Sequence, residues 1–186
     1  YRIWLSFLVD SKISSIFLYP FFVINTLIFL YMFLNFIFSF LKSRYKIVDI
    51  CSIDEAYIDM SDVYLGKDPY QYFKDLQKEI YEKLHIPCSI GVSYCRFLAK
   101  MGSDYKKPMG ITIIRKRDIQ KILYPLPIKD FYGIGKKTVV KLNDIGIYTI
   151  GDFAINESYE LKKILGKFYD VSKKWIVGEG DDVVQV

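Results

Sequence analysis

Residues 52–59 read Ser-Ile-Asp-Glu-Ala-Tyr-Ile-Asp and place two adjacent carboxylates, Asp54 and Glu55, between two stretches with strand-like composition. Like charges at a strand end repel each other and have poor strand propensity, so the pair is unfavourable unless a cation neutralises it. A divalent metal does so, and nucleotidyl transfer uses a metal site of this kind. Mg²⁺ prefers carboxylate oxygens. By itself, an Asp-Glu pair is more often ordinary surface.

The residues around this pair predict an α+β fold. Strands are expected at 45–52, 56–60, 88–93 and 110–114, and helices at 68–84, 95–105 and 117–123. Asp68 and Pro69 are a typical helix start, and apolar residues then recur at helical spacing. The order β-β-α-β-α-β-α predicts a mostly antiparallel sheet with helices on one face. From Ile128 onward only short helices are expected, which indicates a second, helical unit.

Composition and charge add a weaker indication. The net charge is +5, but Asp49–Glu82 holds nine acidic and three basic residues, whereas Arg96–Lys141 holds twelve basic and three acidic ones. An acidic patch beside a basic one suits a site that holds metal ions next to a polyanion. Two ordinary solvated faces explain the same pattern. The three cysteines and one histidine have no zinc-site spacing, which favours reduced thiols.

A second motif begins 37 residues after Asp54. It reads Gly91-Val92-Ser93, then Arg96-Phe97-Leu98-Ala99-Lys100, then Ser103-Asp104-Tyr105-Lys106-Lys107-Pro108-Met109-Gly110. Pro108 is expected to end a helix, so that Lys107 projects from a fixed turn. A lysine is a compact, mobile cation suited to phosphate. The alternative is a plain helix C-terminus whose lysines face the helix dipole.

A third motif spans residues 131–152 and is typical of a helix-hairpin-helix. Gly133 and Gly135 allow the backbone to turn tightly and to approach a phosphate, and the amides that open the next helix then face the anion. Lys136 and Lys137 add positive charge at the same point. Contacts of this kind provide affinity for nucleic acid without base specificity.

In this order the three motifs resemble the Y family of translesion DNA polymerases, the DNA polymerase IV-like (DinB) group, across residues 43–178. The resemblance implies a palm at 43–127, a thumb at 128–178 and, at 179–186, the start of a linker to a little-finger domain. It implies a DNA-directed DNA polymerase, in which a primer 3′-OH attacks the α-phosphate of a dNTP on primer–template DNA.

The resemblance also assigns roles to single residues. Asp54 and Glu55 match the carboxylates that hold two Mg²⁺ ions, and Lys107 matches the lysine that reaches the triphosphate. Residues matching the thumb's DNA-phosphate contacts are Gly133, Gly135, Lys136 and Lys137. Such an enzyme acts in the cytoplasm on the nucleoid, or in the nucleus, and can bind a sliding clamp through its C-terminal part.

The start of the family pattern is not recognisable. The family opens with an Asp-x-Asp-x-Phe-Phe strand, followed by a fingers segment. Phe7-Leu8-Val9-Asp10 echoes that strand, but Asp10 lies 44 residues before Asp54, about half the separation that the family needs. We therefore do not expect Asp10 to be the third metal ligand. We expect an incomplete chain with little or no polymerase activity of its own.

Residues 1–42 are expected to be separate from the palm. Residues 13–41 carry no charge over 29 positions, long enough for a membrane helix of about 20 residues, and Lys42, Arg44 and Lys46 follow on the side that would stay in the cytoplasm. The other explanation is translated non-coding or out-of-frame AT-rich DNA. We predict that 13–41 form helix, started or kinked at Pro20, rather than a strand of the palm.

Two other functions stay open from the sequence. One is a DNA-binding module that keeps the hairpin and lacks catalysis. The other is a membrane-anchored protein held by residues 13–41.

Overall fold

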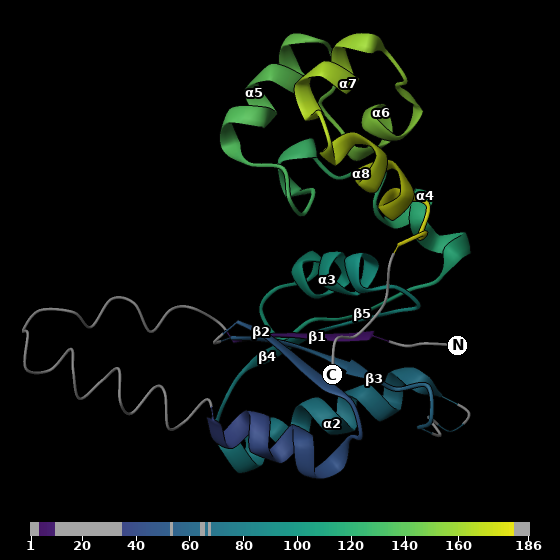
Figure 1. Ribbon diagram of the computed structural model, residues 1–186. Helices are drawn as coiled ribbons and strands as arrows, with labels where there is room; N and C mark the ends of the chain where they lie inside the picture. The colour runs from purple at the N-terminus through teal and green to yellow at the C-terminus, as the bar shows by residue number, and fades with distance from the viewer. Residues whose placement is uncertain (1–3, 10–34, 53, 64–65, 67, 181–186) are drawn as a thin grey trace, which may run out of the picture.

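The computed structural model describes residues 4–9, 35–52, 54–63, 66 and 68–180 (Figure 1). It contains a sheet unit and, above it in Figure 1, a helical unit. The sheet has five strands in the order β2-β3-β1-β4-β5. Their bounds are β1 Trp4–Val9, β2 Val48–Ser52, β3 Glu55–Asp59, β4 Cys88–Ser93 and β5 Ile111–Ile114. All neighbouring strands are antiparallel except β4 and β5, which are parallel, so the mostly antiparallel sheet predicted from the sequence is confirmed.

The central strand β1 comes from the segment that the sequence had set apart. It pairs with β3 on one side and with β4 on the other, with Leu5 opposite both Ile58 and Val92. Residues 35–44 are helical, and Ile37 and Leu41 are buried in the same core as Phe73. The boundary expected at residue 42 is therefore wrong, because parts of the segment on its N-terminal side complete the sheet and its core.

The apolar helix predicted for residues 13–41 is not supported: residues 35–41 belong to a helix that continues to residue 44 and packs in the core of the sheet unit. Residues 13–34, including Pro20, lie outside the described residues, as does Asp10, which follows β1 directly in the sequence. Within the described part of the chain, none of the helices combines the length and the apolar character that crossing a membrane requires.

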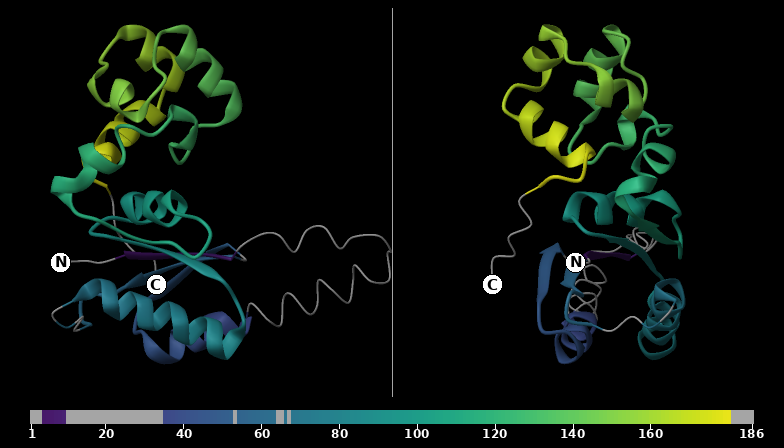
Figure 2. Two further views of the ribbon diagram at one scale, coloured as in Figure 1. Left: turned by 180° about the vertical axis from the view of Figure 1, so that it is seen from behind. Right: turned by 90° about the vertical axis from the view of Figure 1, so that its right-hand side faces the viewer.

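Helices cover both faces of the sheet, so the prediction of helices on one face is wrong. Helix α2 (Pro69–Leu84) lies with residues 35–44 on one face, and α3 (Arg96–Tyr105) lies on the other (Figures 1 and 2). Strand β4 alternates large and small residues: Cys88, Ile90 and Val92 join the α2 core. Gly91, on the opposite face, lets α3 approach closely, because a Cβ there would lie 1.8 Å from the Ala99 carbonyl oxygen.

Local signals determine α2 as predicted. The Asp68 side chain accepts a hydrogen bond from the Tyr70 amide, and Pro69 occupies the first helical position. The helix ends at His85, which adopts a left-handed conformation with φ 54°. The residues that α2 buries against the sheet are Phe73, Leu76, Gln77, Ile80 and Leu84.

The helical unit predicted from Ile128 onward is confirmed. A link of η2 (Lys116–Asp118) and α4 (Ile119–Ile122) leads to η3 (Ile128–Asp130), α5 (Lys136–Asp144), α6 (Ile150–Ile155), α7 (Tyr159–Leu165) and α8 (Phe168–Ile176). Short-range caps begin two of these helices: Thr149 and Asp152 exchange hydrogen bonds at α6, and Ser158 accepts from the Leu161 amide at α7.

Helix α3 belongs to both units. Ala99 packs against Tyr57 of the sheet, while Phe97, Leu98 and Met101 are buried in the core of the helical unit. The ring of Phe97 stacks on Trp175 of α8 with centroids 5.2 Å apart and planes 20° apart. The position of α3 therefore fixes how the sheet and the helical unit meet.

Candidate functional site

The hairpin of β2 and β3 presents the carboxylate pair at its tip. Ser52 pairs with Glu55 across the hairpin, and the register shifts between Ile50 and Ser52. Asp54 lies in the turn, and its Oδ1 accepts a 2.6 Å hydrogen bond from the Ser52 hydroxyl. Glu55 is the first residue of β3. The two adjacent carboxylates therefore stand where two strands meet, as the sequence predicted.

A chain of ion pairs leads from this tip to Lys107. Glu55 Oε1 is shielded from solvent and pairs with the ammonium of Lys100. Lys100 also lies 3.2 Å from Asp104 Oδ2, and Asp104 Oδ1 pairs with Lys107. The structure thus brings Glu55 and Lys107 into one network, although they come from different motifs.

Lys100 is the connecting residue that sequence reasoning passed over. It is 8% exposed. Burial alone lowers the pKa of a lysine, but its bonds to Glu55 and Asp104 outweigh this, so the pKa of Lys100 is raised and the ammonium stays charged. The pairing of Lys100 with Asp104 could have been predicted from the sequence, because the two residues are four positions apart on one helix. Nothing local pointed to Glu55 as the other partner.

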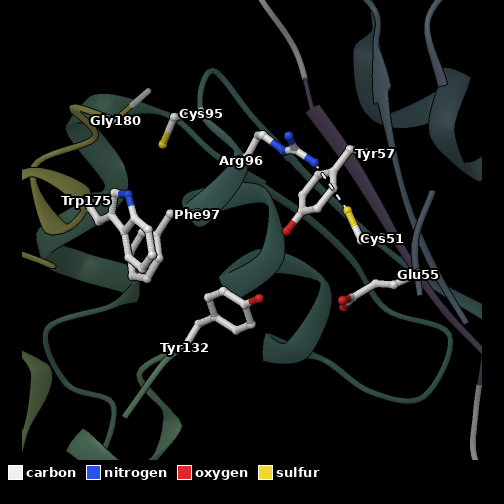
Figure 3. A pocket seen from close by; sticks show the side chains of 9 residues that line it. All are labelled: Cys51, Glu55, Tyr57, Cys95, Arg96, Phe97, Tyr132, Trp175 and Gly180. Atoms are coloured by element: carbon white, nitrogen blue, oxygen red, sulfur yellow. Dashed lines mark hydrogen bonds between the residues drawn. The ribbon is translucent and has the colours of Figure 1, made fainter. Parts of the chain in front are cut away.

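A cavity of about 260 Å³ opens beside Glu55, between the sheet, the start of α3 and the helical unit (Figure 3). Its lining residues are Cys51, Glu55, Tyr57, Cys95, Arg96, Phe97, Tyr132, Trp175 and Gly180. Because Glu55 lines it, a molecule entering this cavity would approach one of the two carboxylates directly.

Arg96 crosses one wall of the cavity. Its Nη2 pairs with Asp49 and lies 3.2 Å from Cys51 Sγ, and the guanidinium lies 4.3 Å above the centre of the Tyr57 ring. Burial, reinforced by the charge of Glu55, raises the pKa of Tyr57, so this phenol stays neutral. The wall therefore combines a cation, an aromatic ring and a neutral hydroxyl.

The two glycines of the predicted helix-hairpin-helix, Gly133 and Gly135, differ in how strictly the structure requires glycine. Gly133 has φ +94°, and a Cβ there would lie 2.7 Å from Phe168 Cζ, so both conformation and space call for glycine. Gly135 is the N-cap of α5 with φ −82°, and a Cβ there meets nothing within 4 Å. Lys136 and Lys137 follow, both exposed. The start of α5 therefore leaves its backbone amides accessible beside two cations.

The carboxylates fit Mg²⁺ in ligand type. Within the described ranges, no three His, Cys, Asp or Glu side chains gather closely enough to hold a metal ion. Mg²⁺ often binds proteins through one or two carboxylates, with waters and substrate phosphates completing the shell. The shielded Glu55 carboxylate already attracts a cation, Lys100, which shows that this position favours positive charge.

Comparisons with known proteins agree with this arrangement. The impB/mucB/samB family matches residues 32–104, and the helix-hairpin-helix motif of the same family matches residues 116–147. DNA polymerase IV of Oceanobacillus iheyensis is 50% identical over 130 residues, which is 70% of this chain and 31% of that protein. DNA polymerase IV 1 of Bacillus subtilis is 44% identical over 129 residues, 69% of this chain and 31% of that protein.

Solved structures give the same result. DinB from Sulfolobus solfataricus superimposes with a TM-score of 0.70 at 30% identity, covering 80% of this chain and 44% of that one. A DinB-family error-prone polymerase from the same organism covers 98% of this chain and 68% of its own with a TM-score of 0.81, and at 23% identity it shows the fold alone. The chain belongs to the Y family of DNA polymerases, in its DinB-like branch. It spans about a third of the length of the curated relatives that it matches.

Proposed function

We propose that this chain supplies the catalytic palm and the thumb of a template-directed DNA polymerase that acts in translesion synthesis and DNA repair. The observation that carries the proposal is the network in which Glu55, at the tip of the hairpin, and Lys107 share Lys100 and Asp104. Polymerization needs a site for metal ions and a site for a triphosphate within reach of each other. The ion-pair network supports such a pairing.

In this proposal each charged group has one task. Asp54 and Glu55 would hold two Mg²⁺ ions, which would supply Lewis-acid chemistry for attack by the primer 3′-OH and for the charge on the phosphates. Lys107, whose side chain is 36% exposed, leaves Asp104 to bind the triphosphate of the incoming dNTP. The neutral Tyr57 and the aromatic rings of the cavity form a largely apolar wall beside Glu55.

The helical unit would hold the DNA. The amides at Gly133, Gly135 and the start of α5, with Lys136 and Lys137, suit backbone phosphates. One related protein of known structure, at 30% identity and a TM-score of 0.72, is described as a ternary complex. We propose primer–template DNA and dNTP as the partners of this chain, with the nucleoid or nucleus as its place of action and a sliding clamp as a further partner of the complete protein.

A chimaera tests the proposal. The matching 130 residues of the Oceanobacillus iheyensis DNA polymerase IV are replaced by those of this chain, and Mg²⁺-dependent primer extension is measured. We expect extension by the chimaera, and a loss of at least about 10²–10³ in rate in Asp54→Asn or Glu55→Gln. Asp59→Asn, in the same strand, is the matched control and should keep most activity.

An inactive but folded chimaera that still binds primer–template DNA would contradict catalysis and favour the non-catalytic DNA-binding module. Extension that survives both carboxylate substitutions would remove Asp54 and Glu55 from the mechanism.

A further inference from the structure

Lys100 stands in an unusual position for a lysine. Lysines are rarely buried to this extent, and a buried charge is tolerated only when other groups compensate it. Here two carboxylates do so, Glu55 on β3 and Asp104 one turn along α3. The structure therefore places a protein cation directly on a carboxylate proposed to bind metal.

The Lys100 ammonium and a metal ion compete for the carboxylate of Glu55. A bound Mg²⁺ lies about 2.0–2.1 Å from its ligand oxygens, and a neighbouring ammonium repels it. The solvent-shielded Oε1 of Glu55 is the atom that Lys100 contacts. A metal that binds this oxygen must displace the ammonium or compete with it.

Asp104 offers the displaced ammonium a second partner. Lys100 already lies 3.2 Å from Asp104 Oδ2, so a small shift transfers it fully to this carboxylate. Asp104 is now shared with Lys107 through its other oxygen. When Lys107 turns to a phosphate, Asp104 is left with Lys100 alone. The ring of Tyr132 lies 5.9 Å from the Lys100 ammonium and provides a further favourable surface for the cation.

We propose that Lys100 is a positioning residue that occupies Glu55 before metal binds, and that Asp104 receives the ammonium when the metal displaces it. The inference rests on the proposed role of Glu55 as a metal ligand. It implies that the charge of Glu55 is compensated by Lys100 when no metal is bound. It also implies that phosphate binding at Lys107 and metal binding at Glu55 favour each other. Phosphate binding releases Asp104 from Lys107, and the freed Asp104 can then accept the Lys100 ammonium that the metal displaces.

Mn²⁺ alone is the probe, and its binding to the 186-residue protein is measured by electron paramagnetic resonance of free Mn²⁺. Lys100→Met removes the competing cation, and we expect Mn²⁺ affinity to rise roughly tenfold, the scale of one charge-assisted contact. A merely structural role for Lys100 predicts the opposite, since a misplaced Glu55 binds metal more weakly. Mn²⁺ affinity that is unchanged or lower in Lys100→Met overturns the proposal.

Arg96→Met is the matched control for charge. It removes one cation from the cavity that Glu55 lines, but the ion pair of Arg96 is with Asp49. We expect its effect on Mn²⁺ affinity to stay below roughly threefold. A gain equal to that of Lys100→Met would mean that general electrostatics, and not occupation of Glu55, explains the result.

Two double variants complete the test. Adding Glu55→Gln to Lys100→Met should abolish the gain in Mn²⁺ affinity. Asp104→Asn should weaken Mn²⁺ binding in the parent chain and have little effect once Lys100 is Met, because it acts through Lys100. Equal effects of Asp104→Asn in both backgrounds overturn the proposal. If Glu55→Gln changes Mn²⁺ binding in no background, the proposed metal site itself fails, which is a different outcome.

Discussion

The sheet unit and the helical unit are held together by interactions of different range. In the sheet unit, β1 pairs with strands formed by residues 55–59 and 88–93, and Arg96 reaches Asp49 and Cys51. In the helical unit, the helix caps join near neighbours, such as Thr149 with Asp152 and Ser158 with Leu161. The proposed chemistry lies where long-range contacts meet, whereas the proposed DNA contacts lie on a local hairpin.

The two proposed roles, metal-dependent catalysis and DNA binding, therefore depend on tertiary packing to different degrees. Glu55 reaches its partner only if α3 packs correctly on the sheet. Gly135 needs little more than its own turn and the helix after it, whereas Gly133 also lies against Phe168 of α8. Substitutions can therefore separate the two units, except at α3, which contributes to both cores.

The largest effect is expected from Gly91→Val. A Cβ at Gly91 would lie 1.8 Å from the Ala99 carbonyl oxygen and 2.3 Å from the Ser103 amide nitrogen, both backbone atoms of α3. We expect the free energy of unfolding, measured by urea denaturation, to fall by more than about 4 kcal/mol. Because α3 serves both units, both should be affected.

Gly135→Val is the matched control for this prediction. The space around Gly135 is open and its φ is negative, so we expect a loss below about 1 kcal/mol. Similar losses in the two variants would contradict the close approach of α3 to β4.

Lys173→Met should destabilise the helical unit alone. The Lys173 ammonium donates to the carbonyl oxygens of Phe153, Ala154 and Asn156 at the end of α6, at 2.9, 2.9 and 2.6 Å. Its removal leaves these carbonyls without that donor, and we expect a loss of about 2–3 kcal/mol. Amide hydrogen exchange should accelerate in α6 and α8 more than in β4. Lys174→Met, at an exposed neighbour, should leave exchange unchanged.

DNA binding tests the local character of the hairpin. We expect Gly135→Val to weaken binding of duplex DNA roughly tenfold, because its side chain blocks backbone approach to a phosphate, and Lys141→Ala to weaken it less than roughly threefold. Fluorescence anisotropy at several salt concentrations should show affinity falling with a slope of about −0.9 per phosphate neutralised. Binding that is insensitive to salt or to Gly135→Val would leave the segment as an ordinary helical hairpin.

The smallest effect is a pH dependence in the helical unit. Hydrogen bonds from Thr149 and Tyr148 amides hold the pKa of Asp152 below its usual value. A lowered folded-state pKa gives stabilisation that is complete above the unfolded value near about 4 and is lost as the pH falls through the folded value. Thermal unfolding should therefore show a decline below about pH 4, worth less than about 1 kcal/mol. Asp152→Asn should remove this part of the decline, and an unchanged profile would contradict the capping role.

The elements that could be predicted from the sequence are those with local signals. The cap at Asp68 and Pro69 set the start of α2, and the strand at 88–93 and the helical unit from Ile128 appear where they were predicted. The hairpin around Asp54 and Glu55 also followed from its own residues. In each case the deciding information lies within a few positions of the element that it specifies.

Contacts between distant segments could not be predicted, because they depend on how the whole chain packs. Residues 7–10 echo the family's opening strand, but nothing near them in the sequence shows that Trp4–Val9 would be the central strand, because its pairing partners lie far along the chain. The alternation of large and small residues in β4 is compatible with burial of both its faces. Which helix covers each face depends on the chain topology and could not be predicted from β4 itself. The pairing of Lys100 with Glu55 was undetermined for the same reason: a charge finds a distant partner only once packing has brought the two segments together and removed the water between them.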